Sequence, residues 1–205
     1  KMLKYLYIIY RKESKGGIGL IGEVIESKTS EFVVEARQYD MVPCYGSIVK
    51  VIDGDRIVYG IVSGAYTGSI DNNTRAKAFF KSIEELKREQ PQIFSLLRTE
   101  FNCVVAGYSE KDIFNPYYPP AHPRLHLSVE KASDDEIIKA TEGFGYLSKT
   151  INYQAGDSDE LTAAALRNAA FLRDKPREYV VSAGRELLKM LSYDTGRLKN
   201  IIDRV

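Results

Sequence analysis

Residues 17–22 (GIGLIG) are the most conspicuous candidate for chemistry, because they satisfy the phosphate-binding pattern G-x-G-x-x-G. In a dinucleotide-binding fold this pattern opens a helix whose free N–H groups hold the pyrophosphate. Here residues 23–36 alternate between apolar and polar side chains, which is typical of a β-hairpin. A kinase loop would need the downstream strings His-Arg-Asp and Asp-Phe-Gly, which the sequence lacks. We therefore interpret these glycines as a loop followed by a tight bend in a small barrel.

The histidines and cysteines are too few and too scattered to form a metal or thiol site. His122 and His126 are separated by Pro123, so they cannot share a helical face. Cys44 and Cys103 have no neighbouring base that would activate a thiolate. We expect neither a metal centre nor a catalytic thiol.

Other motifs also have simpler explanations. Asp53 and Asp55 flank Gly54, where the geometry of a hairpin turn explains the carboxylates better than an acid/base pair does. The triplet 72–74 (NNT) fits a glycosylation acceptor, which has no role in a cytoplasmic protein. A P-loop is absent from the sequence. We expect no enzymatic activity and no cofactor, unless a site is invisible in the sequence.

The aromatic residues, 14 Tyr and 8 Phe without Trp, raise the alternative of a stacking platform for single-stranded nucleic acid. Few basic side chains accompany them, and tyrosines in a small barrel commonly pack with the hydroxyl at the rim. The residues concerned are Tyr39, Tyr45, Tyr59 and Tyr66, with Arg37, Lys50 and Arg56.

The composition is that of a soluble globular protein with one domain, or one domain and a substantial appendage. The chain has 205 residues, 44% hydrophobic and 28% charged, with a net charge of +1. Two cysteines favour a reducing cytoplasm. The apolar run at 5–10 is far shorter than the roughly 20 residues that span a bilayer, so we expect no contact with membranes.

The first half of the chain predicts a small antiparallel β-barrel in an α+β fold. The strands are short, and the first four have no long helix between them, which favours an antiparallel barrel over a parallel sheet, whose crossovers need a dozen or more residues. Asp53-Gly54-Asp55 is a strong hairpin signal. The predicted strands are 19–26, 31–36, 47–52, 56–63 and 101–109, and 125–129 could add another.

An insertion at 71–98 interrupts the strands and is predicted to be helical. Ala76, Phe79, Phe80, Ile83 and Leu86 recur at spacings of three and four. Residue 91 is a proline, which ends this helix or starts a second one. After the last strand, four prolines among residues 115–123 predict an extended connector.

The remaining residues predict a helical domain over 133–205, after a barrel domain over 1–132. Residues 133–136 (SDDE) form a capping box that opens a predicted helix reaching Phe144 and Leu147, and further helices are predicted from 157 to 173, 176 to 191 and 194 to 205. The helix at 176–191 has an unbroken apolar seam, and we expect it to form an interface. The seam includes Val180, Leu187, Leu188 and Leu191.

Charge is uneven along this helical half. Residues 130–160 carry 3 basic and 8 acidic side chains, whereas 161–205 carry 9 basic and 5 acidic ones. Solvated helix faces explain this distribution most simply, since acids favour helix N-termini and bases C-termini. A basic surface for phosphates and self-association through opposite charges are the alternatives.

The order of strands and glycines resembles the HAS-barrel, the small β-barrel at the N-terminus of HerA-type DNA-translocating ATPases and of rotary ATP synthase catalytic subunits. The resemblance is carried by 22–24 (GEV), by Gly46 before the third strand and by 60–62 (GIV), and it covers about residues 18–133. Glycines predicted at barrel turns are Gly22, Gly46, Gly54 and Gly60.

The resemblance implies an assembly role, because such barrels form a crown on a hexameric ATPase. In the HerA-type proteins the barrel leads into a RecA-like motor, whereas here about 70 helical residues follow. We therefore expect a non-catalytic assembly or adaptor protein whose partner is itself or a hexameric HerA-type DNA-processing ATPase. A small barrel that binds single-stranded nucleic acid is the alternative.

Overall fold

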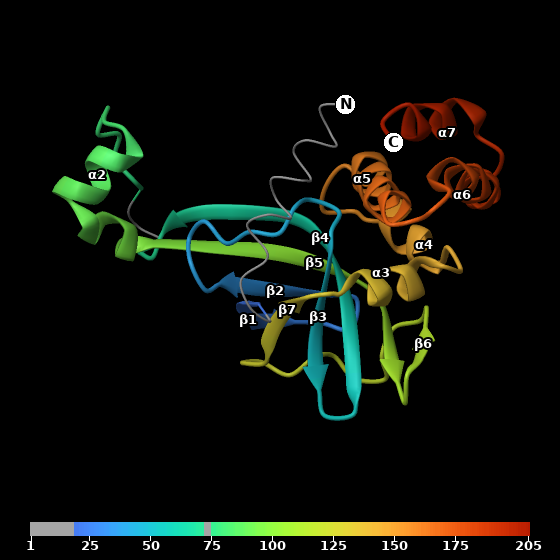
Figure 1. Ribbon diagram of the computed structural model, residues 1–205, viewed down its shortest axis with the longest axis horizontal. Coiled ribbons are helices and arrows are strands. Elements are labelled where there is room, and N and C mark those ends of the chain that lie inside the picture. Colours follow the sequence, from blue (N-terminus) through green and yellow to red (C-terminus); the bar gives the residue numbers. More distant parts are fainter. Residues whose placement is uncertain (1–18, 72–74) are drawn as a thin grey trace.

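Six antiparallel strands close into a barrel in this computed structural model, which describes residues 19–71 and 75–205. The order around the barrel is β2-β1-β7-β3-β4-β5, and β5 pairs back with β2 (Figure 1). A short strand, β6, extends the sheet beside β5. The strands are β1 (Leu20–Ser27), β2 (Glu31–Ala36), β3 (Ile48–Asp53), β4 (Arg56–Ser69), β5 (Leu97–Glu110), β6 (Ile113–Asn115) and β7 (Ser128–Lys131). This confirms the predicted α+β class with a small antiparallel barrel.

β-Branched and aromatic side chains fill the barrel. Alternate residues of each strand point inward, so that Val49 and Val51 of β3 are fully buried in the interior. Val129 of β7 is also fully buried, and its strand lies between β1 and β3. The interior cluster comprises Ile21, Val24, Phe32, Val34, Val49, Val51, Val58, Val62, Phe101, Cys103, Val105 and Val129.

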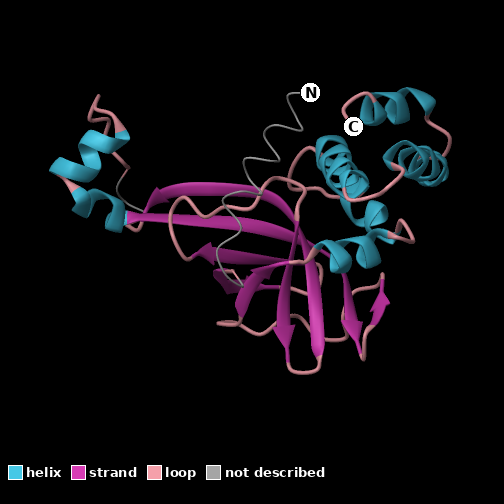
Figure 2. Cartoon of the chain, in the orientation of Figure 1, coloured by secondary structure: helices cyan, strands magenta, loops and turns pink. Residues whose placement is uncertain are grey.

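The helices that follow β7 pack on the outer face of β3, β4 and β5 (Figure 2). Ile48, Ile61 and Val104 point out of the barrel and join a second core cluster with these helices. Strands β3–β5 are therefore buried on both faces over part of their length. The helices are α3 (Asp134–Thr141), α4 (Gly145–Ile151), α5 (Ser158–Phe171), α6 (Pro176–Met190) and α7 (Thr195–Ile202).

β4 and β5, each of 14 residues, continue past the barrel as a two-stranded ribbon. A bulge at Ser63, whose Oγ donates to the carbonyl oxygen of Asn102 (3.3 Å), marks the point of departure. The hydroxyls of Thr67 and Thr99 are hydrogen-bonded across the ribbon (2.7 Å). We call residues 64–102 the arm. It projects to the left of the barrel in Figure 1 and ends in α2 (Ile83–Glu89) and the 3-10 helix η1 (Pro91–Leu96).

Three predicted elements differ from the structure. Among the described residues of the insertion at 71–98, which are 71 and 75–98, only those of α2 and η1 are helical, since Phe80 has a φ of 54° that no right-handed helix accommodates. Likewise, Phe144, with a φ of 57°, divides the helix expected after Ser133 into α3 and α4. The sixth barrel strand begins at Ser128, three residues later than predicted, and the preceding residues 123–127 are loop.

An ion pair joins the barrel to the helices. Lys50 Nζ on β3 lies 2.9 Å from Glu136 Oε1 in the first turn of α3. Burial by itself would raise the pKa of Glu136, but hydrogen bonds from Ser133 and Lys50 outweigh it, so this pKa is lowered. The ionised carboxylate therefore stabilises the fold above the pKa it has in the unfolded chain.

Acid should remove this contribution. As the pH falls through the lowered pKa, Glu136 becomes protonated and its contribution to the free energy of unfolding is lost. Glu136→Gln lacks the contribution from the start, so its stability should fall less than that of the wild type below about pH 5. Urea unfolding between neutral and acidic pH checks this, with Glu142→Gln, an exposed position just after the same helix, as control. Parallel pH curves for wild type and Glu136→Gln would contradict it.

Close packing inside the barrel explains one strand glycine. A Cβ on Gly60 would lie 2.5 Å from Cζ of Phe32 and 2.9 Å from Cβ of Cys103, both in the interior cluster. Gly60→Ala should therefore lower the free energy of unfolding by about 1–3 kcal/mol. Gly64→Ala is the matched control on the same strand, since its nearest non-neighbour atom, in Asn102, is 4.0 Å away. Denaturant unfolding compares them, and equal effects of the two substitutions would refute the packing explanation.

Candidate functional site

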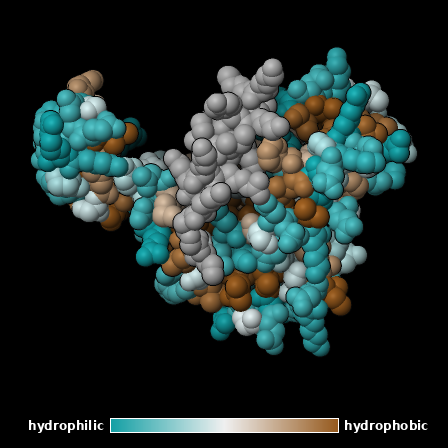
Figure 3. Space-filling view, viewed as in Figure 1, coloured by the Kyte–Doolittle hydropathy of each residue, from teal (hydrophilic) through white to brown (hydrophobic). Residues whose placement is uncertain are grey.

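The tip of the arm exposes several large apolar side chains to solvent. We call residues 75–96 the arm tip. Phe80 is 98% exposed, Leu96 60% and Ile83 56%, and neither α2 nor η1 contains a buried residue. Brown, hydrophobic atoms are visible on this end of the molecule in Figure 3. Large apolar side chains without a core beneath them are typical of an interaction site.

Local hydrogen bonds, not burial, hold the tip in shape. The Ser82 side chain accepts from the backbone N–H of Glu85, and the Glu85 carboxylate accepts from the N–H of Ser82, which completes a capping box. The same hydrogen bonds lower the pKa of Glu85. Lys81 and Glu89 form an ion pair, and Pro91 starts η1. The helix therefore begins just after Phe80 and leaves that ring in solvent.

The arm is fixed to the loop between β2 and β3 through Thr99 and through Phe94 of the arm tip. Thr99 Oγ1 of β5 donates to the carbonyl oxygen of Tyr39 (2.6 Å), and the Tyr39 ring lies 5.3 Å from that of Phe94 in η1. Lys87 Nζ is 5.9 Å from the Phe94 ring centroid. A cleft of about 420 Å³ lies along this contact. The loop before β3 thus orients the arm, so the tip is presented in a defined direction.

A second candidate feature is an open pocket of about 530 Å³ between α3, the α3–α4 turn and the start of α6. We call it the α6 pocket. Most of its wall is apolar, and the Phe144 ring packs against that of Tyr179, tilted by 35°, with 5.0 Å between ring centroids. Its lining includes Ile138, Phe144, Leu172, Arg173, Tyr179 and Ser182.

The polar groups of the α6 pocket are engaged within the protein. Arg173 donates to the carbonyl oxygens of Ala169 (3.1 Å) and Ile138 (3.0 Å) and to Thr141 Oγ1 (2.9 Å). Its guanidinium carbon lies 4.1 Å from the centroid of the Tyr179 ring. Arg173 therefore joins α3, α5 and α6, and most of its donors are already used.

Two tyrosines meet beneath this pocket. The hydroxyls of Tyr146 and Tyr179 are 3.0 Å apart, and Tyr179 donates to the carbonyl oxygen of Thr141 (2.7 Å). Burial raises the pKa of Tyr179, and it raises that of Tyr146 well above the ordinary value. Both phenols therefore stay protonated at neutral pH and serve as hydrogen-bonding groups that connect α3, α4 and α6.

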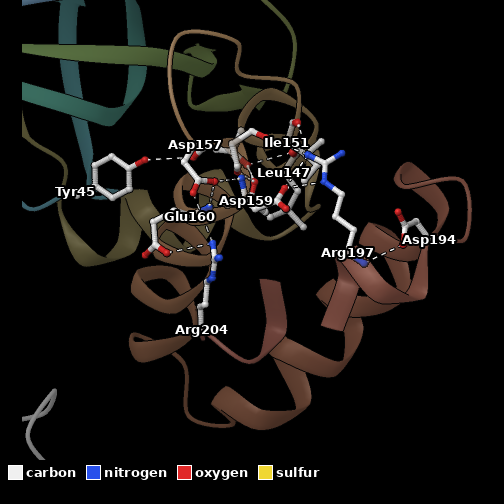
Figure 4. Close-up of polar contacts among 12 residues, drawn as sticks. Tyr45, Leu147, Ile151, Asp157, Asp159, Glu160, Asp194, Arg197 and Arg204 are labelled. Carbon is white, nitrogen blue, oxygen red and sulfur yellow. Dashed lines mark hydrogen bonds and ion pairs between the residues drawn. The ribbon is translucent and has the colours of Figure 1, made fainter. Parts of the chain in front are cut away.

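The acidic N-terminus of α5 is paired with Arg197 of α7 and with Arg204, which follows that helix (Figure 4). Asp157 caps α5, and Asp159 Oδ1 lies 2.7 Å from Arg197 Nη2. Arg204 Nη1 is 3.4 Å from Glu160 and 3.8 Å from Asp157. The carboxylates hold α7 against α5. Within residues 19–71 and 75–205, no group of three or more His, Cys, Asp or Glu side chains could hold a metal ion.

Residues 21–111 match the sequence model of the HAS barrel domain. The closed barrel observed over and around these residues agrees with that match. The chain therefore contains a HAS barrel domain. No curated protein matches the chain. The strand that closes the HAS barrel, β7, lies beyond the matched range, and so do α3–α7.

The four glycines singled out in the sequence have different roles in the HAS barrel. Gly54 (φ 64°) lies in the β3–β4 turn and Gly46 (φ 75°) in the turn before β3. Gly22 and Gly60 lie inside β1 and β4 instead of at turns. A Cβ on Gly22 would meet the carbonyl oxygen of Glu35 at 2.3 Å, so close strand packing accounts for that residue.

Gly46 also attaches the helices to the HAS barrel. A Cβ there would lie 2.7 Å from the backbone of Ala164 in α5. Beside it, Tyr45 Oη donates to the carbonyl oxygen of Asp157 (3.5 Å), and Asn168 Nδ2 donates to that of Tyr45 (3.2 Å). The turn before β3 is thus packed directly on α5.

The apolar seam of α6 is used inside this chain. Leu187 and Leu191 are buried in the cluster shared by the HAS barrel and the helices, and Val180 packs against that cluster. Leu188 is half-buried. The predicted interface therefore includes an intramolecular contact. The arm tip, whose spacing predicts an amphipathic helix, instead exposes Phe80, Ile83 and Leu96.

The remaining candidate residues lie apart from one another. Arg124 pairs with Asp53 (2.7 Å), His126 Nδ1 is 2.6 Å from Glu23 Oε1, and Cys103 is buried within the HAS barrel. Residues 5–10, 17, 18 and 72–74 lie outside the described residues. Among the described helices, none is long and apolar enough to cross a membrane.

Proposed function

We propose that the protein is a non-catalytic assembly or adaptor module of the cytoplasm that acts through protein–protein contacts of its arm. The observation that carries this proposal is the exposed arm tip, where Phe80, Ile83 and Leu96 have no core to cover them. A short helix without buried residues gains little stability from its own chain. Contact with a partner would cover this surface and stabilise the tip.

The resemblance of the HAS barrel to that of HerA-type ATPases suggests the kind of partner. In this proposal the protein associates with a hexameric HerA-type DNA-processing ATPase and contributes a barrel and an arm to that assembly. The ATPase would supply hydrolysis, and this chain would supply contact surface.

Direct binding of single-stranded nucleic acid is supported less well. Of the four tyrosines that could stack with nucleobases, Tyr59 is buried, Tyr39 packs on Phe94 and Tyr45 bonds to Asp157, which leaves Tyr66 as the widely exposed one. The arm tip has a net charge of only +2, from five basic and three acidic side chains. Strong phosphate binding usually rests on a larger cluster of bases.

Light scattering on the purified protein, alone and mixed with a HerA-type ATPase from the same genome, tests the proposal. We expect a stable complex whose mass is unchanged by a single-stranded oligonucleotide at low or moderate salt. The variant Phe80→Asp/Ile83→Asp should abolish the complex. Ile113→Asp, an exposed position on β6 away from the arm, is the matched control and should retain it.

Two results would reject the proposal. A protein that forms no protein complex and shifts in mass only with oligonucleotide at low salt would be a nucleic-acid-binding protein. If the Phe80→Asp/Ile83→Asp variant still forms the complex, the arm tip does not make the contact, and the proposal that the protein acts through its arm is rejected.

A further inference from the structure

We propose that two copies of this chain exchange α7, so that the α7 of each molecule packs on α5 and α6 of the other. Within one molecule α7 packs on its own α5 and α6. We call the surface of α5 and α6 that it covers the α7-binding face. The partner is therefore a second copy of this chain. Such an exchange goes beyond the proposed function and does not depend on the arm.

The turn between α6 and α7 is made of residues that do not favour its conformation. Ser192 (φ 52°) and Tyr193 (φ 65°) are both left-handed, although each carries a Cβ. Ser192 directly follows the C-cap of α6, a position at which helices commonly have glycine. The Tyr193 residue is 71% exposed, so burial of its ring does little to offset the cost. No glycine or proline occurs from 185 to 195, so the sequence allows this turn to become helical.

The apolar stripe of α6 continues in phase into α7. Leu191, Leu198 and Val205 follow one another at intervals of seven residues, which is close to two helical turns. All three belong to the cluster shared by the barrel and the helices or pack against it. A helix that ran without a break from α6 into α7 would carry one apolar stripe, interrupted at Asp194. The same residues therefore suit a folded-back α7 and a straight α6–α7 helix.

The contacts of α7 define which helix the α7-binding face accepts. Arg197 Nη2 lies 2.7 Å from Asp159 Oδ1, and Arg204 Nη1 lies 3.4 Å from Glu160 Oε2 (Figure 4). On its apolar side, Ile201 is fully buried. The face thus fits an apolar helix flanked by arginines. A straight α6–α7 helix would leave this face uncovered and its own α7 exposed, and a second straight molecule supplies the matching helix and the matching face.

The balance between the monomer and the exchanged dimer depends on the turn. Exchange preserves the contacts of α7 with its binding face, because both copies have the same sequence. It replaces two left-handed residues by helical ones, which favours the dimer. Loss of translational and rotational freedom favours the monomer. Since the exchange is reciprocal, association stops at two copies, and the dimer fraction should rise with protein concentration.

Substitutions in the turn should shift this balance in opposite directions. Glycine accepts a positive φ, so Ser192→Gly/Tyr193→Gly stabilises the folded-back α7, and the dissociation constant of the dimer should rise at least about tenfold. Ser192→Ala/Tyr193→Ala favours the continuous helix and should lower this constant about tenfold. Both variants lack the Tyr193 ring, so loss of a contact made by that ring would change both in the same direction. Light scattering over a range of concentrations measures the constant.

Charge reversal tests whether α7 itself is exchanged. Arg197→Asp places two carboxylates opposite each other, and Asp159→Arg places two guanidinium groups there, so each variant alone should be monomeric. When the two variants are refolded together from urea, exchange brings the altered α7 of one chain onto the altered face of the other. The two unaltered partners also meet, so every pair again has opposite charges. We expect a 1:1 heterodimer by native mass spectrometry.

Lys189→Glu and Glu186→Lys are the matched controls for this mixture. Their ion pair (2.8 Å) lies within α6, so exchange of α7 cannot restore it. Each variant should dimerise as the wild type does, and mixing them should leave the dimer fraction unchanged.

Any one of three results would overturn the exchange of α7. They are a wild type that stays monomeric at every concentration, turn variants with equal dissociation constants, and charge-reversed variants that form no heterodimer on mixing. The proposed function is tested separately, since it depends on Phe80 and Ile83 of the arm tip. If a HerA-type ATPase binds Arg197→Asp but not Phe80→Asp/Ile83→Asp, the proposed function stands whether or not α7 is exchanged.

Discussion

Leu187→Ala is expected to lower the free energy of unfolding by about 2–5 kcal/mol. Leu187 lies in α6 and is fully buried in the cluster that also contains Tyr59 and Ile61 of the barrel. Truncation removes three carbon atoms from this cluster and leaves a cavity between the helices. Because the cluster joins helices and barrel, the whole chain should remain a single cooperative unit with a lower midpoint.

Urea unfolding followed by far-ultraviolet circular dichroism and by tyrosine fluorescence measures both the size and the cooperativity of this effect. Leu188→Ala is the matched control, because it makes the same change at a half-buried neighbour on the same helix and should cost less. Two separate transitions in the wild type would contradict a shared core and would indicate that the helices unfold independently of the barrel.

Phe101→Ala should have an effect of about 3–5 kcal/mol. Phe101 of β5 is fully buried inside the barrel, and it pairs with Val34 of β2 on one side and with Ala65 of β4 on the other. It lies where the barrel ends and the arm begins. Loss of its ring should weaken the barrel interior and loosen the base of the arm.

Phe80→Ala is the control for this second substitution. It makes the same chemical change at a ring that is almost fully exposed, so its effect on stability should be within about 0.5 kcal/mol. Thermal unfolding of the two variants gives the comparison. Similar losses for both would show that Phe80 is covered in solution, which the monomer described here does not explain.

Much of the barrel could be predicted from local patterns. The alternation in β1 and β2 and the Asp53-Gly54 turn are short-range signals, and each is found where it was expected. The capping box at Ser133 likewise marks the start of α3, and the seam of α6 marks a buried helix face. These features depend on neighbours within a few residues, which a sequence displays directly.

The arm and the closing strand could not be predicted in the same way. Residues 64–69 and 97–100 extend the predicted strands because they pair with each other across the insertion, and no local pattern shows that pairing. β7 lies between β1 and β3, although about 100 residues separate it from β1 and about 75 from β3 along the chain. Its register therefore depends on the finished barrel.

The candidate site was the least predictable part. Phe79, Phe80 and Ile83 have the spacing of an amphipathic helix, and such a stripe normally lies against a core. A sequence shows that apolar residues share a face, but it does not show whether anything lies opposite. Here the positive φ of Phe80 and the late start of α2 direct the stripe into solvent.

Closure by β7 also determines the order in which the protein can be completed during synthesis. Until residue 131 leaves the ribosome, β1 and β3 each present an unpaired edge to neighbouring chains. A fragment cut at residue 111 would keep both edges open permanently and would be expected to aggregate. The barrel is therefore protected from edge-to-edge association only after β7, the strand directly before the helices, has been synthesised.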